Sequence, residues 1–171
     1  MWATGSRSWF GAIFSTIGIT HKKIVFKIPY TAGAGEEQTY SCETDMVLSA
    51  GDRVQSTPRN MAEDEVVVSL KTSSKDRMGK IFLDKMLMSR FAERSVKVVG
   101  IFHNDVQRKK HADVSFTLVS GLFMVYTRFL ETLDGVYFVD PPPKALVPPL
   151  SNHIRSFSQF VLHDVWQLLP P

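Results

Sequence analysis

The chain has 171 residues, 44% of them hydrophobic and 22% charged, which supplies one domain with a core of its own and leaves too little for two comfortable domains. Its formal net charge of +3 is mildly basic, and by itself this does not identify a polyanionic partner. The single cysteine, Cys42, excludes an internal disulfide and a cysteine-based zinc cluster, and it fits the cytoplasmic location that we expect.

The N-terminal segment has no acidic residue before Glu36 and contains an apolar run, Trp9 to Ile19, after Arg7. A signal or transit peptide has this form, but no small-x-small cleavage pattern follows and the next segment continues into strand-like sequence. We therefore expect an ordinary helix over residues 8–19. No stretch is long enough to cross a bilayer, so we expect no membrane contact. The apolar face of the helix carries Trp9, Ile13, Phe14 and Ile17.

Two strand-like segments follow, residues 23–30 and 38–49, separated by a glycine-containing turn at residues 31–36. This arrangement predicts a hairpin. Alternation in the second strand predicts two opposite faces, one with Tyr40, Cys42, Thr44, Met46 and Leu48 and the other with Glu43, Asp45 and Val47.

The centre of the chain has the pattern of strand, helix and strand. Residues 65–71 are rich in β-branched residues and end at Lys71, residues 75–94 form a helix that is apolar nearly all the way round, and residues 96–102 form a further strand. This order predicts a right-handed crossover between parallel strands, with the helix as a central, well-covered element. In the first of these strands Val66, Val68 and Leu70 share one face, and Val67, Ser69 and Lys71 share the other.

The remaining segments are less periodic. We expect loops at residues 50–64 and 103–113, a strand-then-helix segment at 116–130 whose switch point the pattern does not fix, a short strand at 136–139, an extended proline-rich segment at 141–149 and an amphipathic helix at 151–169. No linker divides the chain, so we expect one domain over residues 1–171. Its catalytic core would span about residues 23–102, with a C-terminal helical part at 150–169.

Lys71 is the residue from which a functional hypothesis starts. A lysine at the end of a buried strand is costly unless an opposite charge lies nearby. Two aspartates are in reach along the chain, Asp45 on the preceding strand and Asp84 on the following helix. Metal-dependent phosphodiester cleavage needs carboxylates that hold a divalent cation and often a cation near the attacking water, and one or two carboxylates are enough for Mg²⁺.

The helix itself carries a polar sector within an apolar surface. At 100° per residue, Arg77, Lys80 and Asp84 fall together, close to Met88 and Phe91. Such a sector faces either solvent, as an ordinary i,i+4 pair of Lys80 and Asp84, or a polar cleft. The sequence leaves both alternatives open.

The segments T-D-M-V-L at residues 44–48 and V-V-V-S-L-K at 66–71 resemble the nuclease core of the PD-(D/E)XK superfamily. That family places an aspartate in one strand motif and an acid-x-lysine on the next strand. Here Thr44 stands in place of the proline, which is a minor change. Ser69 occupies the position of the second acid, which is a serious change because serine does not hold a metal as a carboxylate does.

One branch of that family, the EcoRII-like type II restriction endonucleases, has the same departure, with the second acid on the following helix thirteen residues after the lysine. Asp84 has this spacing from Lys71. The run K-T-S-S-K-D-R at residues 71–77 also resembles the K-T-T-C-K-D-R run of that branch. The matching residues are Lys71, Thr72, Lys75, Asp76 and Arg77.

The resemblance implies an α/β fold with a mixed sheet flanked by helices, and the activity of a Mg²⁺-dependent type II restriction endonuclease. It implies that Asp45 and Asp84 bind the metal, that Lys71 stands near the attacking water and the scissile phosphate, and that the carbonyl of Leu70 completes the metal shell. Arg77 would hold a phosphate or orient Asp84. We regard Glu43 and Ser69 as auxiliary residues.

The expected partners are double-stranded DNA and a second copy of the chain, because cutting both strands calls for two active sites. The C-terminal helix is either a dimer contact or a cap on the core. The histidines lack zinc spacing, and the chain has no glycine-rich phosphate loop and no nucleophile elbow, so we expect no organic cofactor. Backbone phosphates would be contacted by Lys75, Arg77, Arg53, Arg59, Arg108, Lys109 and Lys110.

Two alternatives remain open beside the restriction endonuclease. One is a repair or mobile-element nuclease of the same superfamily with little sequence specificity. The other is a non-catalytic nucleic-acid-binding domain that kept the fold. In the second case Asp45, Lys71 and Asp84 would be a turn residue, a snorkelling lysine and a surface ion pair.

Overall fold

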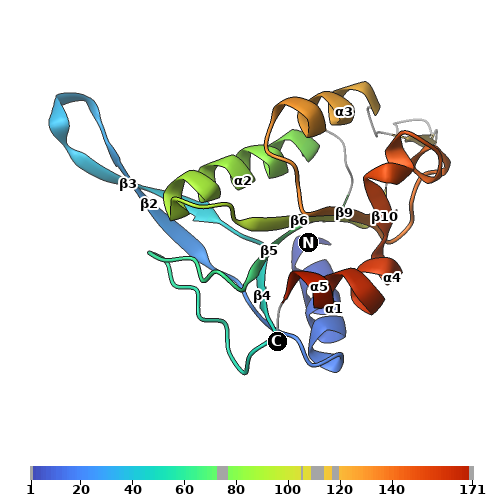
Figure 1. Cartoon of the computed structure of the whole chain (residues 1–171), viewed down its shortest axis with the longest axis horizontal. Helices are drawn as coiled ribbons and strands as arrows, with labels where there is room; N and C mark the ends of the chain where they lie inside the picture. The colour runs from blue at the N-terminus through green and yellow to red at the C-terminus, as the bar shows by residue number, and fades with distance from the viewer. Residues whose placement is uncertain (1, 73–76, 105, 109–113, 117–119, 170–171) are drawn as a thin grey trace.

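A computed structural model of the chain describes residues 2–72, 77–104, 106–108, 114–116 and 120–169 (Figure 1). Its centre is a six-stranded mixed sheet in the order β1-β4-β5-β6-β9-β10. The first three strands in this order are antiparallel neighbours, and β5, β6, β9 and β10 run parallel. The strands are β1 (Thr20–Lys22), β4 (Met46–Ser49), β5 (Val66–Lys71), β6 (Lys97–Phe102), β9 (Gly135–Phe138) and β10 (Ile154–Ser156).

The strand–helix–strand unit at the centre has the predicted order. β5 pairs with β6 in parallel along its whole length, and α2 (Met78–Ala92) connects them. The run of β-branched residues in β5 is buried, as suits a strand covered on both faces. Helix α2 packs against the sheet on one side only, since Leu83 on its outer side is 61% exposed. The expectation of an all-round covered helix was therefore wrong.

Helices cover both faces of the sheet (Figure 1). On one face α2 and α3 (Ser120–Phe129) lie over a core that includes Val67 and Val98. On the other face α1 (Trp2–Thr16) and the C-terminal helical segment lie over a core that includes Val68 and Val99. Alternate residues of each strand thus feed two separate cores. The C-terminal segment consists of α4 (Phe157–Gln159), the π-helical turn η4 (Phe160–Asp164) and α5 (Val165–Leu168).

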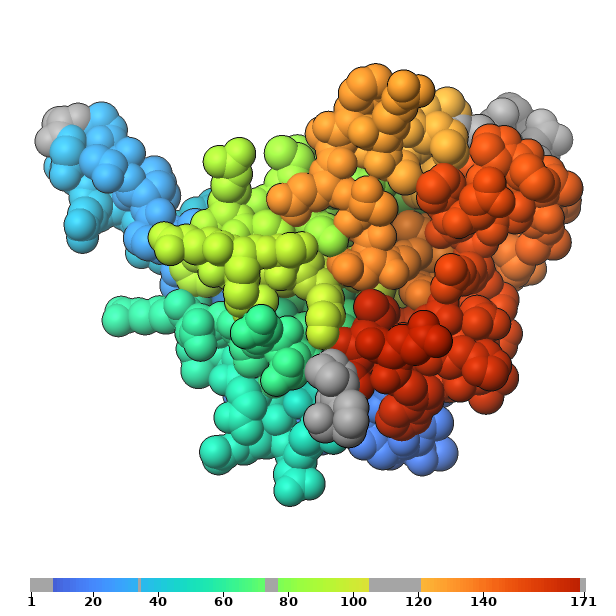
Figure 2. All heavy atoms as spheres, in the orientation of Figure 1, coloured from blue at the N-terminus to red at the C-terminus, as the bar shows by residue number. Residues whose placement is uncertain are grey.

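The predicted hairpin exists and projects from the body of the molecule (Figures 1 and 2). It consists of β2 (Val25–Thr31) and β3 (Glu37–Glu43), joined by the 3-10 turn η1 (Gly33–Gly35). However, residues 38–49 are not one strand. The chain leaves β3 at Thr44, whose hydroxyl bonds to the backbone of Ile24, and enters the main sheet as β4.

The break at Thr44 changes which side chains share a face. Cys42 lies in the core under α2, whereas Met46 and Leu48 lie in the core on the opposite side of the sheet. The predicted common face of these residues was therefore wrong. Alternation fixes the face of a side chain only while the strand stays straight and in one sheet, and here the bend resets it.

Several element bounds also differ from the expectation. The first helix covers residues 2–16 and is followed by Gly18 with φ +81°, so it begins and ends earlier than 8–19. The expected loop at 103–113 contains β7 (Val106–Arg108), which pairs with β8 (Val114–Phe116). The proline-rich segment is not fully extended, because it contains the 3-10 turn η2 (Pro143–Leu146).

The C-terminal helix begins later than residue 151. Residues 150–152 form the 3-10 turn η3 (Leu150–Asn152), and the next three residues form strand β10 beside β9. Ser156 caps the helix that follows, because its hydroxyl accepts a hydrogen bond from the amide of Gln159. None of the described helices is both long and apolar enough to span a membrane.

Candidate active site

The elements β4, β5 and α2 bring Asp45, Lys71 and Asp84 to one cavity of about 290 Å³. Asp45 comes just before β4, and β4 pairs with β5 so that Met46 lies opposite Val68. One residue further along this register, Asp45 lies beside Ser69, on the same face of β5 as Lys71. The cavity is therefore formed where the hairpin leads into the sheet and α2 returns over it.

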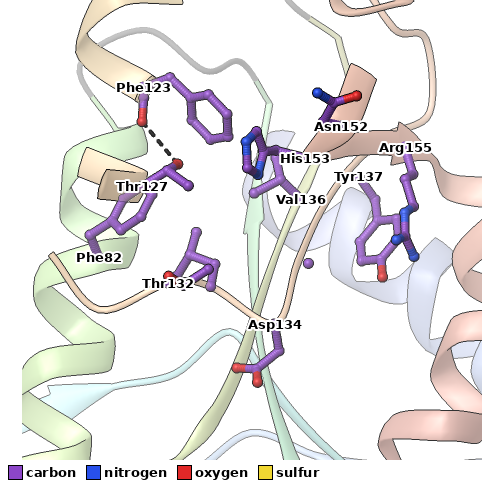
Figure 3. Close-up of a pocket in the computed structure, with 12 residues that line it drawn as sticks. Phe82, Phe123, Thr127, Thr132, Asp134, Val136, Tyr137, Asn152, His153 and Arg155 are labelled. Atoms are coloured by element: carbon purple, nitrogen blue, oxygen red, sulfur yellow. Dashed lines mark hydrogen bonds between the residues drawn. The ribbon is translucent and has the colours of Figure 1, made fainter. Parts of the chain in front are cut away.

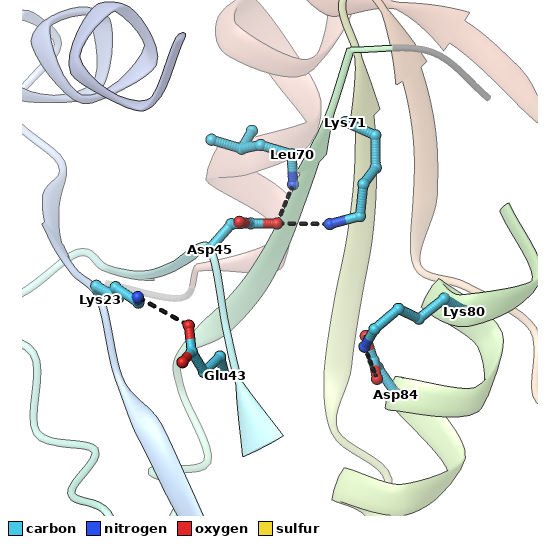
Figure 4. Close-up of polar contacts among 7 residues, drawn as sticks. All are labelled: Lys23, Glu43, Asp45, Leu70, Lys71, Lys80 and Asp84. Atoms are coloured by element: carbon cyan, nitrogen blue, oxygen red, sulfur yellow. Dashed lines mark hydrogen bonds and ion pairs between the residues drawn. The ribbon is translucent and has the colours of Figure 1, made fainter. Parts of the chain in front are cut away.

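Asp45 and Lys71 form a close ion pair across the two strands (Figure 4). One carboxylate oxygen, Oδ2, lies 2.7 Å from the ammonium of Lys71 and accepts a hydrogen bond of 3.0 Å from the amide of Leu70. The side chains of Lys71 and Asp45 are only 14% and 19% exposed. Asp45 thus supplies the opposite charge that a lysine at the end of a buried strand needs.

Asp84 is held by a different lysine. The ammonium of Lys80 lies 2.7 Å from each of the two carboxylate oxygens of Asp84 (Figure 4). Burial lowers the pKa of Lys80, but the hydrogen bond and the charge of Asp84 raise it by more. Asp84 is 17% exposed and lines the cavity, whereas Lys80 is 57% exposed. The polar sector of α2 thus combines the two alternatives that the sequence left open. Lys80 and Asp84 form an exposed i,i+4 pair, and Asp84 also faces a polar cleft.

The oxygen donors of the cavity suit a hard divalent cation such as Mg²⁺. Two carboxylates from different elements, Asp45 and Asp84, line the same cavity, and its volume leaves room for water ligands. Within the described residues no group of three or more His, Cys, Asp or Glu side chains is close enough to hold a metal. Mg²⁺ keeps several waters and is commonly bound by one or two carboxylates, so this donor set fits it.

A scan of family models and a search of curated protein sequences find no match to this chain. Solved structures that are similar to it in fold include two restriction endonucleases. The type IIP restriction endonuclease Kpn2I is 20% identical with a TM-score of 0.60, over 75% of this chain and 41% of that one. The restriction endonuclease PspGI, solved with its substrate DNA, is 16% identical with a TM-score of 0.61, over 95% of this chain and 59% of that one.

The chain has the restriction-endonuclease fold. The mixed sheet flanked by helices was predicted from the sequence, and the similarity to these two enzymes confirms it. At this level of identity the similarity shows the fold alone, so the EcoRII-like branch stays a prediction. The chain spans about 41% of the length of Kpn2I and 59% of the length of PspGI.

Within this restriction-endonuclease fold the auxiliary residues Glu43 and Ser69 also line the cavity. Ser69 is buried, and Glu43 lies at the rim, where Lys23 contacts it at 2.9 Å. Leu70 does not line the cavity; its side chain belongs to the core on the opposite side of the sheet, and its amide contacts Asp45. The contribution of its carbonyl to a metal shell therefore remains a prediction.

The predicted DNA-binding residues lie outside the cavity or outside the described residues. Arg77 is exposed just before the first turn of α2, and Arg53 and Arg59 are exposed on the segment between β4 and β5. Arg59 lines a separate hollow beside the hairpin together with Lys27 and Phe91. Lys75, Lys109 and Lys110, and the side chain of Arg108, lie outside what the structure describes.

The sequence did not identify Lys85, which is the most deeply buried lysine among the described residues. Its ammonium lies 2.7 Å from both Asp134 Oδ2 and the carbonyl of Thr132. The same oxygen of Asp134 accepts a hydrogen bond of 2.7 Å from the amide of Val98. A lysine within the apolar face of α2 is the only signal that the sequence offers for this pair.

A second cavity of about 130 Å³ is lined by Asp134 and Arg155, among other residues (Figure 3). The charged side chains that line it already have partners, since Asp134 pairs with Lys85 and Arg155 pairs with Asp164 at 2.7 Å. One pair ties α2 to the chain before β9, and the other ties β10 to the C-terminal segment. We interpret this region as structural.

Proposed function

We propose that the chain is a metal-dependent endonuclease that hydrolyses phosphodiester bonds in DNA, as a type II restriction endonuclease. The observation that carries this proposal is the position of Asp45, Lys71 and Asp84, which come from successive elements and line one cavity. The restriction-endonuclease fold supports it. So does the similarity to PspGI, which was solved with its substrate DNA.

In this proposal Asp45 and Asp84 bind Mg²⁺, with the carbonyl of Leu70 as a further ligand. When bound, the ion supplies Lewis-acid chemistry, polarising a phosphoryl oxygen and lowering the pKa of a bound water. Lys71 stays at the end of β5, oriented by Asp45 at 2.7 Å, and its ammonium stabilises the charge that develops on the phosphate. Ser69 lines the same cavity and adds no negative charge beside Lys71.

The partner in this proposal is double-stranded DNA, and the active form is a homodimer with one site for each strand. Arg53, Arg59 and Arg77 are exposed and contribute positive charge for backbone phosphates. The C-terminal helical segment covers the core and also leaves Leu162 and Trp166 exposed at 65% and 46%, so it is a candidate dimer contact.

Cleavage of supercoiled plasmid DNA in Mg²⁺ tests this function. We expect discrete fragments from the native protein and at least about a hundredfold slower cleavage by Lys71→Ala and Asp84→Ala. Lys22→Ala, an exposed residue of β1, is the matched control and keeps the native rate. Circular dichroism of each variant checks that it is folded.

The products distinguish the alternatives. A smear of fragments that disappears in Lys71→Ala identifies a nuclease with little sequence specificity. An intact plasmid with the pure native protein, in Mg²⁺ and in Mn²⁺, contradicts the proposed function, and DNA binding that is the same in Asp45→Ala then identifies a non-catalytic binding domain.

A further inference from the structure

We propose that Lys80 is a displaceable counter-ion of Asp84: its ammonium occupies the carboxylate in the metal-free protein and leaves it when a divalent cation binds. This inference rests on the proposed metal site, because it concerns the same aspartate. It gives Lys80 a role in metal binding beyond that of a surface ion pair.

The ammonium of Lys80 contacts both carboxylate oxygens of Asp84. Both oxygens of Asp84 lie 2.7 Å from the same ammonium, so each oxygen that would bind a cation already faces a positive charge. A divalent cation needs at least one of these oxygens at a distance of about 2 Å. The cation and the Lys80 ammonium therefore compete for one carboxylate.

The charge of the cavity lining also favours the displacement of one lysine when a cation binds. Among the described residues the lining has three carboxylates, Glu43, Asp45 and Asp84, and two ammonium groups, Lys71 and Lys80. Lys23 lies outside the lining and neutralises Glu43 at 2.9 Å, so the carboxylates of the lining are already balanced by ammonium groups. Binding a divalent cation with Lys71 and Lys80 in place would make this region positive, and moving one lysine out reduces the excess.

Of these two lysines, Lys80 can leave and Lys71 is held. Lys80 is 57% exposed and lies in the first turn of α2, so its flexible four-carbon side chain reaches water by rotation. Lys71 is 14% exposed at the end of a buried strand. The carboxylate that it contacts, that of Asp45, also accepts a hydrogen bond from the amide of Leu70. The exposed lysine is thus the one whose displacement costs little.

Direct Mn²⁺ binding to the DNA-free protein, measured by electron paramagnetic resonance of free Mn²⁺ or by calorimetry, tests the proposal without relying on activity. We expect Lys80→Gln to bind Mn²⁺ roughly fivefold more tightly than the native protein, the factor that an ion pair at the upper end of the exposed range would contribute. Lys80→Arg keeps the charge and the native affinity. Lys22→Gln removes the same charge away from the cavity and changes the affinity less than about twofold.

The variant Asp84→Asn distinguishes the metal site itself from the role of Lys80. If Mn²⁺ binds the native protein and is lost in Asp84→Asn, the metal site stands; equal affinities of Lys80→Gln and Lys22→Gln would then overturn the role of Lys80 alone. Weaker Mn²⁺ binding by Lys80→Gln would overturn it too. If the native protein binds no Mn²⁺ at millimolar concentration, the proposed metal site and the role of Lys80 are both wrong.

Discussion

Two lysine–aspartate pairs face the same cavity and are built in opposite ways. In both pairs the ammonium lies 2.7 Å from a carboxylate oxygen, and the aspartates are similarly covered, at 19% exposed for Asp45 and 17% for Asp84. The partners differ: Lys71 is 26 residues from Asp45 and 14% exposed, whereas Lys80 is four residues from Asp84 and 57% exposed. The contact distance therefore does not distinguish a fixed lysine from a displaceable one. The burial of the lysine side chain does distinguish them.

The largest expected effect tests this comparison through catalysis. Under the proposed function, Lys71→Met slows plasmid cleavage by roughly a hundredfold to a thousandfold, because it removes a charge aimed at the reacting phosphate. Lys80→Gln changes the rate at saturating Mg²⁺ by less than about tenfold, because its ammonium leaves Asp84 before reaction. Single-turnover rates measure both. Equal losses in the two variants would break the distinction between the pairs.

A third pair, Lys85–Asp134, extends the comparison to stability. The side chain of Lys85 is only 5% exposed, and its ammonium has two partners that lie far along the chain. Lys85→Met leaves the carboxylate of Asp134 without its cation, and we expect a loss of about 3 kcal/mol in the free energy of unfolding. Urea denaturation measures this loss.

The double variant Lys85→Met with Asp134→Asn is the control for this third pair. Because the two groups form one contact, the double variant should lose less free energy of unfolding than the sum of the losses in the two single variants. Additive losses would show that burial of Lys85, and not its pairing with Asp134, determines the effect.

A fourth pair, Arg155–Asp164, adds pH dependence. Burial raises the pKa of Asp164, but hydrogen bonds from Arg155, Gln159 and Tyr137 lower it by more, so its pKa in the folded protein is below its ordinary value. The ionised form thus stabilises the fold above the unfolded pKa of about 3.9, and this stabilisation is lost as the pH falls through the folded pKa.

We therefore expect Asp164→Asn to cost about 1–3 kcal/mol of unfolding free energy at pH 7 and progressively less as the pH falls below 4. Urea denaturation at several pH values measures the difference. Arg155 is 54% exposed, so it resembles Lys80 in this respect. Arg155→Gln should therefore lower the free energy of unfolding at pH 7 much less than Asp164→Asn does. A difference between native and Asp164→Asn that does not change with pH would contradict the assignment.

The smallest expected effect concerns Lys80 and stability. Its pair with Asp84 involves an exposed lysine, and such pairs contribute about 1 kcal/mol at most. Lys80→Gln should therefore shift the thermal midpoint by no more than a few degrees. A large drop in the midpoint would mean that Lys80 is a structural residue and would weaken its role as a displaceable counter-ion.

The sequence predicted the central unit of the fold because its signals there are local. The β-branched run of β5, the helix α2 and the strand β6 each follow their own periodicity, and the parallel pairing of β5 with β6 follows from their order. The cost of a lysine at the end of a buried strand likewise predicted an opposite charge near Lys71, and Asp45 is there.

The errors occur where the path of the chain depends on distant partners. Residues 38–49 alternate like one strand, but β3 pairs with β2 and β4 pairs with β5, so the chain bends at Thr44 between two sheets. Residues 154–156 follow a helical pattern of apolar side chains, yet they form β10 because the edge of β9 offers backbone partners. Neither partner is visible in the local sequence.

By itself the sequence determined the order of the central strand–helix–strand unit, the residue types that stand at Asp45, Lys71 and Asp84, and the spacing between them. Only the tertiary structure decided that Asp45 contacts Lys71, that Asp84 faces the same cavity from α2 and that Lys80 occupies its carboxylate. The physical reason is that periodicity is a property of one segment. The meeting of side chains depends instead on the register and the bends that segments far apart in the chain impose on each other.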